Sequence, residues 1–410
     1  MAGIVSYGAY VPIYRLAREE IARAWVRSGG EGERSVANWD EDSITMAVEA
    51  TLDCIRGKDR DAIDALYFAS PTSPYRGKMS ASIVAAACDL REDILIIDFS
   101  NSTRSGLNAI QAALDAVASG SKEEVVVAIA DCQTAVPESE LETTFGDGAA
   151  AFLIGNSNVA VTVEDSYSVS SPFSYAWRRE EDAYPETTEA RFAIFHSYDL
   201  PIKQAISNVM KRAGLTSKNF SKAVFSAPTV RSHQNMARSV GLDVKAQLQS
   251  LMFHELGDTG AALAPMMLIS ALEQSRSGDR ILFAGYGDGA EAHILQVTEE
   301  IENLSDRRGV SRNLASKMML PSYEKYLRFR NLLAKETDRR TFWEPDRTSL
   351  PVMWREQKQI LNLHGSLCRH CGNIQFPIQR LCAWCQAKDD YDEVRLSDKT
   401  GKIFTFSMDE

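Results

Sequence analysis

The sequence predicts a duplicated α/β fold in which helical layers and sheets alternate in the order αβαβα. The first observation is an internal repeat, because Gly146-Asp-Gly-Ala-Ala-Ala-Phe-Leu-Ile154 returns little changed as Gly287-Asp-Gly-Ala-Glu-Ala-His-Ile-Leu295. An apolar run precedes each copy, Val125 to Ile129 and Ile281 to Ala284. The third observation is that helix-like and strand-like patterns alternate in the same order before both copies. A repeat of this length with alternating elements is typical of α/β proteins.

Each predicted element of the first half has a counterpart in the second half. In chain order, first half against second, the pairs are helices Ser43–Arg56 and Ile202–Ala213, strands Ala65–Ala69 and Ala223–Ser226, helical segments Ala81–Cys88 and Met236–Val240, strands Ile94–Phe99 and Leu248–His254, and helices Ser105–Ala118 and Thr259–Glu273. The apolar runs and the repeated strings follow. Such alternation predicts mostly parallel sheets joined by right-handed crossovers.

The helices Ser105–Ala118 and Thr259–Glu273 are apolar nearly all round, which favours burial between two sheets over an exposed position. The alternative architecture is one large doubly wound sheet, which does not require the two halves to match element by element. The matching halves therefore favour the duplicated, layered form.

Composition narrows the class of protein. The 410 residues, 44% hydrophobic and 25% charged, are ordinary for a globular chain of two or three domains. The formal net charge of -11 argues against a nucleic-acid partner, which requires a basic face. The sequence shows neither a secretory signal pattern nor a run of about twenty apolar residues. We expect a cytoplasmic protein with no membrane segment.

Four regions are predicted along the chain. Residues 1–165 and 166–304 form the two halves of the layered fold. Residues 305–362, dense in Arg, Lys and Glu and interrupted by Pro345 and Pro351, read as a linker with a helix. Residues 363–410 form a separate small unit.

That small unit carries a predicted metal site. Two Cys-x-x-Cys pairs, separated by ten residues, supply four thiolates from two tight turns, Cys368, Cys371, Cys382 and Cys385. Four soft ligands suit tetrahedral, structural zinc, and a closed site of this kind has no position open for catalysis. The alternative is a redox or disulfide role, for which one such pair is enough. His370, inside a pair, is expected to face solvent.

Several motifs, in order, resemble hydroxymethylglutaryl-CoA synthases of the thiolase superfamily over roughly Gly3 to Ile301. They are Asn101-Ser-Thr-Arg-Ser-Gly106, Trp177-Arg178 with Tyr184-Pro185, Gly257-Asp-Thr-Gly-Ala261 and Tyr286-Gly-Asp-Gly289. The tail resembles the zinc-ribbon and OB-fold module of thiolase-like proteins, with Gly401 to Ser407 as its first barrel strand. The resemblance implies a thiolase-type fold, an acyl-CoA substrate, and a homodimer, either alone or within a larger complex.

The catalytic residue types that the resemblance leads us to expect have all changed. Thr103 falls where the family has its acyl-accepting cysteine, and Ser226 falls at its histidine. The family's glutamate aligns near Pro71 and its asparagine aligns with Asp258. A hydroxyl nucleophile without an adjacent base is weak, so the acyl-cysteine route is disfavoured.

An aldol or retro-aldol reaction on a β-hydroxyacyl-CoA does not need an acyl-enzyme. It needs a base for the β-hydroxyl and donors that stabilise a thioester enolate. His254, Asp258 and Tyr286 lie on or just after second-half strands and are the expected candidates, with Thr103 and Ser226 beside them. Two alternatives stay open: a degenerate subunit that binds acyl-CoA or supports a partner, and a hydroxymethylglutaryl-CoA synthase-like acyltransferase.

Each candidate also has a structural interpretation. Thr103 and Asp258 could cap helices, His254 could be satisfied at a strand end, and Tyr286 could pack over the glycine turn. Asp147 and Asp288 recur in both halves, which favours a role in turns. Arg178 and its neighbour Arg179 could hold CoA phosphates, although an exposed charged loop explains them better.

Overall fold

The structure is a computed structural model that describes residues 2–27, 30–179, 181–333 and 349–407. Its contacts divide the chain into two compact units. The first consists of Met1–Val84 and Asp93–Ala334, and the second of Ala85–Glu92 and Lys335–Glu410. Both predicted halves of the layered fold lie in the first unit, except for Ala85–Glu92 of the first half.

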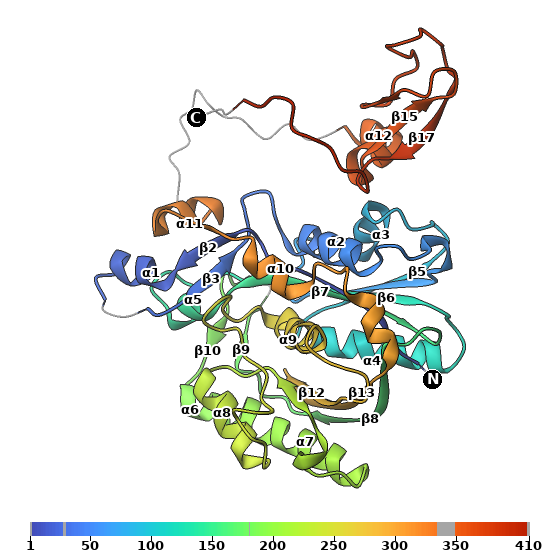
Figure 1. Ribbon diagram of the computed structural model, residues 1–410. Coiled ribbons are helices and arrows are strands. Elements are labelled where there is room, and N and C mark those ends of the chain that lie inside the picture. Colours follow the sequence, from blue (N-terminus) through green and yellow to red (C-terminus); the bar gives the residue numbers. More distant parts are fainter. Residues whose placement is uncertain (1, 28–29, 180, 334–348, 408–410) are drawn as a thin grey trace. The chain divides into compact units, whose positions relative to one another are not determined.

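A nine-stranded sheet runs through the first unit in the order β11-β12-β13-β8-β1-β7-β6-β4-β5 (Figure 1). Its strands are β1 Gly3–Tyr10, β4 Ala65–Ala69, β5 Leu95–Phe99, β6 Val125–Cys132, β7 Asp147–Gly155, β8 Val161–Ser170, β11 Lys222–Phe225, β12 Arg280–Tyr286 and β13 Gly289–Val297. The first-half strands and the second-half strands join where β1 pairs with β8 at Gly3 and Ile4. The two predicted sheets are therefore hydrogen-bonded into one.

Helices form three layers around this sheet, as predicted (Figure 1). The central layer holds α4 Ser105–Ala118 and α9 Leu263–Leu272, which is preceded by a 3₁₀ turn, η4 Gly260–Ala262. Helix α4 packs on β4, β6 and β7, while α9 contacts β7 on one side and β11 and β12 on the other. The outer layers contain α2 Ser43–Cys54, α3 Ala81–Ala87 and α10 Gly309–Ala315 on the first half, and α7 Leu200–Arg212 and α8 Val230–Ser239 on the second.

The central helices can be buried because their sequences carry almost no charge on the packed faces. Every α9 residue except Ser270 is buried, and α4 buries Leu107, Ile110, Ala113, Leu114 and Val117. Gly106 permits the close approach of the two helices, since a Cβ there would lie 3.0 Å from the carbonyl oxygen of Ala261. Contact between the halves therefore begins at the first turns of α4 and η4.

Two expectations about the strands were wrong. The sheet is mixed, parallel at β11–β12, β6–β4 and β4–β5 and antiparallel elsewhere. The reason is that each repeated string is a strand that runs back beside its predecessor, as β13 does after the Gly287–Gly289 turn. The predicted strand Leu248–His254 is also missing, because Met252 takes a left-handed conformation (φ 54°) and only Leu248 bridges to Ala223.

A smaller sheet and several short helices complete the first unit. They are β2 Tyr14–Ala17, β3 Glu33–Val36 and β14 Met318–Met319, with α1 Arg18–Ala24, α5 Glu140–Thr144 and α11 Tyr323–Phe329. The connection between the halves contains β9 Ala176–Trp177, β10 Glu186–Thr187, α6 Ala190–Ile194 and a π-helical turn, η2 Phe195–Asp199. Because α10, β14 and α11 lie within residues 305–362 and belong to the first unit, part of the predicted linker is part of that unit.

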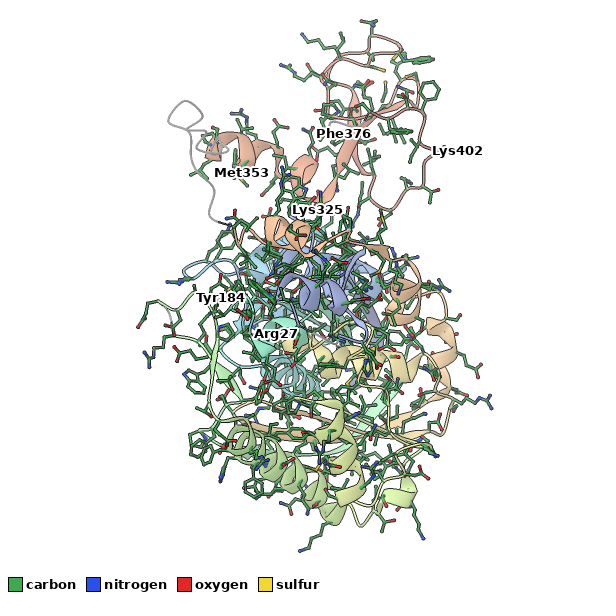
Figure 2. The ribbon with its side chains drawn as sticks, turned by 90° about the vertical axis from the view of Figure 1, so that its left-hand side faces the viewer. Arg27, Tyr184, Lys325, Met353, Phe376 and Lys402 are labelled. Atoms are coloured by element: carbon green, nitrogen blue, oxygen red, sulfur yellow. The ribbon has the colours of Figure 1, made fainter. Side chains whose placement is uncertain are left out.

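The second unit is built around a three-stranded sheet of β15 His364–Cys368, β16 Ile374–Gln375 and β17 Tyr391–Arg395, with α12 Leu350–Asn362 before it. Within this unit Asp89 contacts His364 at 3.2 Å and Arg395 at 3.7 Å. Met353 on α12 and Phe376 after β16 mark this unit in Figure 2. The predicted barrel strand Gly401–Ser407 is not a strand, because β17 takes the place beside β15 and residues 401–407 have no pairing among the described residues.

No helix in the described part of the chain has the length and apolar character to cross a membrane.

Candidate functional site

The start of α4 and the end of β12 meet in the first unit. The Thr103 hydroxyl donates to the carbonyl oxygen of Tyr286 at 3.2 Å. Gly287, with φ 149°, allows this approach, because a Cβ there would lie 2.6 Å from the Thr103 Oγ1. Thr103 does not cap α4, since its hydroxyl donates to Tyr286 and no side chain caps the first turn of this helix. The structure therefore brings Thr103 and Tyr286, two of the candidate residues, together.

Tyr286 lies among other ionisable groups at this junction. Burial raises its phenol pKa well above the usual value, and the nearby Asp258, Tyr175 and Tyr198 raise it further. The ring of Tyr198 meets that of Tyr286 edge-on, with centroids 5.0 Å apart. A phenol in this setting stays protonated at neutral pH and can donate a hydrogen bond.

Asp258 stands at the entry to η4, where both its side chain and its backbone carbonyl accept hydrogen bonds. Its Oδ1 accepts the Gly260 amide at 2.8 Å, so the carboxylate does cap this turn. Its backbone carbonyl accepts from Gln133 at 3.0 Å and from the Gly146 amide at 2.8 Å. Burial raises the pKa of this carboxyl to about 6, while the Gly260 amide lowers it. A carboxylate with such a pKa is ionised at neutral pH and is still able to accept a proton.

Asp131, at the end of β6, is a site residue that the sequence interpretation missed. It is fully buried, and it accepts hydrogen bonds from Thr72 at 2.6 Å, the Cys132 amide at 3.0 Å and the Ala261 amide at 3.1 Å. Burial raises its pKa to about 7 against the effect of these donors. The available signal was its position, since a lone acid directly after the apolar run Val125–Ala130 lies at a strand's carboxyl end.

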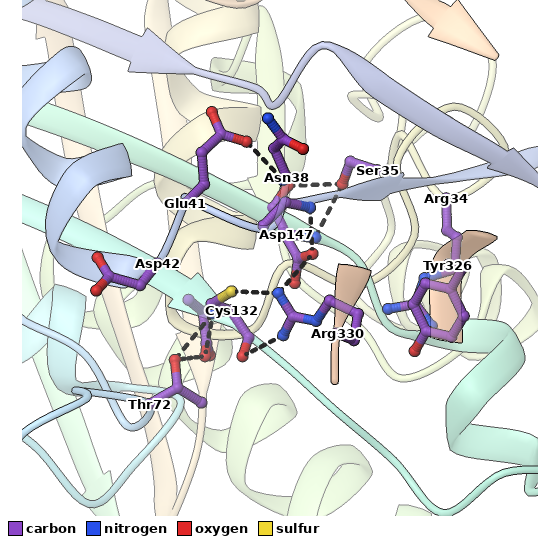
Figure 3. A network of polar contacts seen from close by, with 12 residues as sticks. Arg34, Ser35, Asn38, Glu41, Asp42, Thr72, Cys132, Asp147, Tyr326 and Arg330 are labelled. Atoms are coloured by element: carbon purple, nitrogen blue, oxygen red, sulfur yellow. Dashed lines mark hydrogen bonds and ion pairs between the residues drawn. The ribbon is translucent and has the colours of Figure 1, made fainter. Parts of the chain in front are cut away.

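A polar network continues from Asp131 to the residue that follows α11 (Figure 3). Arg330 donates to the Cys132 sulfur at 2.7 Å and forms an ion pair with Asp147 at 3.6 Å. Burial disfavours the charge of Arg330, but Asp147 and Cys132 outweigh it and raise the guanidinium pKa. Burial also raises the pKa of the Cys132 thiol to about 12. Cys132 is therefore an unreactive, hydrogen-bonded thiol in this setting.

The remaining predicted residues differ in where they lie. Ser226 is buried just after β11, and because Phe225 pairs with Ala284 of β12, it follows the strand next to the one that carries Tyr286. His254 is exposed, and its carbonyl accepts the Glu33 amide at 2.8 Å beside β3, so its expected place near Asp258 and Tyr286 is not what the structure shows. The cause is the turn at Met252, which replaces the predicted strand. Arg178 is exposed on the connection between the halves.

The two aspartates of the repeat have diverged. Asp147 is fully buried, begins β7 and accepts the Ala37 amide at 2.7 Å. Asp288 sits in the turn after β12 with a left-handed backbone (φ 46°) and accepts a hydrogen bond from Ser174. The expectation of a turn role therefore holds for Asp288, whereas Asp147 organises a buried network.

The four clustered cysteines of the second unit converge as a metal centre would require. Their sulfurs all lie within 4.8 Å of one another, and the pairs Cys368–Cys385 and Cys371–Cys382 are 3.6 Å apart. Tetrahedral zinc with bonds of about 2.3 Å places its sulfurs about 3.8 Å apart, so the spacing fits the ion. All four are free thiols, not disulfides, and His370 is exposed.

Comparisons with known proteins agree with this architecture. Residues 210–297 match the family described as 3-oxoacyl-[acyl-carrier-protein (ACP)] synthase III C terminal. Among solved structures, an HMG-CoA synthase complexed with CoA is 17% identical with a TM-score of 0.71, covering 82% of this chain and 92% of that one. The 3-oxoacyl-[acyl-carrier-protein] synthase III of Aquifex aeolicus has a TM-score of 0.64 at 20% identity, covering 72% of this chain and all of that one. These likenesses show a thiolase-type fold.

Curated relatives identify the family. The hydroxymethylglutaryl-CoA synthase of Pyrococcus horikoshii is 33% identical over 338 residues, which cover 81% of this chain and 93% of the relative. The enzyme of that name from Methanopyrus kandleri is 33% identical over 342 residues, covering 81% and 97%. Because these matches span nearly the whole of both relatives, the chain belongs to the hydroxymethylglutaryl-CoA synthase family.

Proposed function

We propose that this protein is a CoA-thioester lyase or aldolase, which breaks or forms a C–C bond of a β-hydroxyacyl-CoA without an acyl-cysteine intermediate. Relatives named for hydroxymethylglutaryl-CoA and a similar structure titled as a complex with 3-hydroxy-3-methylglutaryl coenzyme A support the thioester substrate. The observation that carries the proposal is that Asp258 is close enough to raise the pKa of the Tyr286 phenol, which lies beside a helix start, residues 100–106, that contains no cysteine.

Asp258 and Tyr286 divide the work through their environments. Asp258, with a pKa of about 6, is the base that accepts the β-hydroxyl proton. Tyr286 keeps its proton and donates a hydrogen bond to the thioester oxygen. Two groups with such different pKa values are suited to act as base and donor in one reaction.

In the cleavage direction the electrons balance as follows. Asp258 takes the β-hydroxyl proton, the β-carbon becomes a carbonyl, and the Cα–Cβ bond breaks. Its electron pair forms the thioester enolate, whose oxygen the Tyr286 phenol stabilises. Proton transfer from the protonated Asp258 to the α-carbon releases the shorter acyl-CoA and restores the base. The condensation is the reverse sequence.

The second candidate is the acyl transfer and condensation for which the relatives are named. The observation that favours it is sequence identity over most of both chains. In this chain the transfer would have to use Thr103 or Ser102, because Cys132 is bound by Arg330 and both Cys54 and Cys88 are fully buried. Neither hydroxyl has a described histidine or carboxylate within hydrogen-bond distance.

Two further features belong to this proposal. The four cysteines would hold one structural zinc ion, whose charge would tie the two turns of the second unit together.

The edge strand β5 of the large sheet carries half-exposed apolar side chains, with Leu95 43% exposed. An open apolar edge favours pairing with another strand, so we expect a homodimer through β5.

The deciding experiment is incubation of the full chain with β-hydroxyacyl-CoA and acyl-CoA thioesters, followed by mass spectrometry of small molecules and protein. A released aldehyde or ketone with a shortened acyl-CoA supports the lyase. A covalent acyl group on the protein supports transfer and contradicts it. Thioester binding with neither product identifies a binding subunit and also contradicts the lyase.

A further inference from the structure

The connection between the two halves exposes a group of aromatic side chains, which we call the aromatic patch: Phe173, Phe192, Phe195 and His196. The three phenylalanines are 49%, 48% and 49% exposed. Their rings surround the imidazole, with centroid distances to His196 of 5.9, 4.3 and 5.0 Å. A contiguous exposed apolar surface of this kind often marks a site where a ligand or a partner binds. Tyr184, in the same connection, is labelled in Figure 2.

Two hydrogen bonds, one between backbone atoms and one between side chains, attach this patch to the candidate active site. The Ser171 amide donates to the carbonyl oxygen of Asp288 at 3.1 Å, and the Ser174 hydroxyl donates to the Asp288 carboxylate. Phe173 lies between these two anchors. The patch therefore begins at the same turn that follows Tyr286, and it is fixed to that turn from both sides.

The π-helical turn η2 joins the patch to a buried phenol. Phe195 and His196 are its first residues, and Tyr198 follows on the inner side. Tyr198 is fully buried against Tyr286, yet its hydroxyl has no hydrogen-bond partner among the described residues. A buried hydroxyl left without a partner is rare and costly, and π-helical turns are frequent at functional sites. Both observations point to a ligand oxygen at this hydroxyl.

We propose that the aromatic patch binds the acyl chain of a large apolar acyl thioester, and that Tyr198 donates a hydrogen bond to an oxygen of that substrate. The inference rests on the proposed function and names its substrate class. A long or cyclic apolar acyl group that covers the phenylalanines stabilises the complex in proportion to the area it removes from water, and an acyl group of two to four carbons has less surface with which to cover them. The aromatic side chains of the patch favour an acyl group that is long or bulky, apolar, and without a charge at its far end.

Calorimetric titration of the full chain with decanoyl-CoA, butanoyl-CoA and CoA tests the inference. We expect decanoyl-CoA to bind at least ~10-fold more tightly than butanoyl-CoA, since part of its six additional methylenes becomes buried. Phe192→Ser should weaken decanoyl-CoA binding at least ~5-fold and leave butanoyl-CoA unchanged. Phe404→Ser, at a fully exposed phenylalanine of the second unit, is the matched control and should change neither.

Tyr198→Phe tests the polar part separately. It should weaken both acyl-CoA ligands by a similar factor, about 5-fold, because the lost hydrogen bond is to an oxygen that they share. Equal affinities of decanoyl-CoA and butanoyl-CoA would overturn the inference while leaving the proposed function intact. If neither thioester binds, both fail. A Phe192→Ser variant that keeps its decanoyl-CoA affinity but changes the sedimentation coefficient would assign the patch to a protein contact and overturn the inference.

Discussion

The backbone amide of Ala261 donates a hydrogen bond to the Asp131 carboxylate across 3.1 Å, so a buried acid at the end of β6 holds the first turn before α9. The same carboxylate accepts from Thr72 and from the Cys132 amide. One side chain thus ties together a strand and a loop of the first half and a helix entry of the second half. Ala261 lies three residues after Asp258, so this hydrogen bond fixes the chain close to that carboxylate.

Asp131→Asn should destabilise the protein in a pH-dependent manner. Burial raises the folded-state pKa of Asp131 to about 7, whereas an unfolded aspartate titrates near 4. Between these values the folded state binds more protons, so the contribution of Asp131 to stability is complete below pH ~4 and falls as pH rises through ~7. We expect the drop in Tm caused by the substitution to be larger at pH 5 than at pH 8.5. A pH-independent drop, or one as large for the exposed Asp115→Asn, would contradict this assignment.

Asp258→Asn should lower turnover at least ~10-fold while keeping the fold, because an amide oxygen can still accept the Gly260 amide but cannot serve as a base. The wild-type rate should rise with pH across about 6, where the carboxyl ionises, and the variant should lose this limb. Rates measured from pH 5 to 8 on any thioester that the protein turns over test both points. A variant with the wild-type profile would remove Asp258 from the mechanism.

Tyr286→Phe should also lower turnover at least ~10-fold, since it removes the donor to the enolate oxygen. Because the ring remains, the edge-on contact with Tyr198 and the thermal stability should be kept. The effect should appear in kcat more than in KM, as the hydrogen bond strengthens when negative charge develops. An unchanged kcat would refute the donor role.

Arg330→Gln should destabilise the first unit and make the Cys132 thiol accessible to alkylation. Removing the guanidinium leaves Asp147 buried without its ion-pair partner, a change that costs about 3–5 kcal/mol. Thermal melts measure the loss, and iodoacetamide followed by peptide mass spectrometry measures alkylation of Cys132. Arg328→Gln, at an exposed position two residues away, is the control. Equal alkylation of Cys132 in wild type and variant would show that Arg330 does not protect this thiol.

One zinc ion per chain is expected in purified protein by elemental mass spectrometry. Cys382→Ser should remove most of it, since three thiolates and a hydroxyl hold zinc less tightly than four thiolates. His370→Ala should keep the ion, because His370 is exposed and is not one of the four converging ligands. Well under one zinc per chain in wild-type protein would contradict the zinc assignment.

Much of the site's framework could be predicted because its signals are local. The sequence placed Thr103 at the start of a buried helix, and the structure shows the hydroxyl of Thr103 there in contact with the carbonyl oxygen of Tyr286. Helix α4 begins and ends at the predicted residues, and β4 does too, because each is a continuous periodic segment. The four cysteines also converge as their spacing predicts, since two short turns fix the ligand pairs.

The rest depended on contacts between residues far apart in the chain. Asp131 meets Thr72 and Ala261 over 59 and 130 residues, and Arg330 reaches Cys132 over 198 residues. No periodicity encodes such pairings. The prediction for His254 was wrong for a local reason. One left-handed residue, Met252, replaces the predicted strand on which that prediction depended.

The sequence by itself determined the duplicated elements and the cysteine cluster, because apolar periodicity and ligand spacing act over a few residues, and its motifs carried the resemblance to the family. Only the tertiary structure decided that the repeated strings are antiparallel strands, that Asp147 is buried while its counterpart Asp288 forms a turn, and that Asp131 and Tyr198 belong beside the site. The physical reason is that burial and hydrogen-bond partners, which set the pKa of an acid or the cost of an unpaired hydroxyl, come from distant segments.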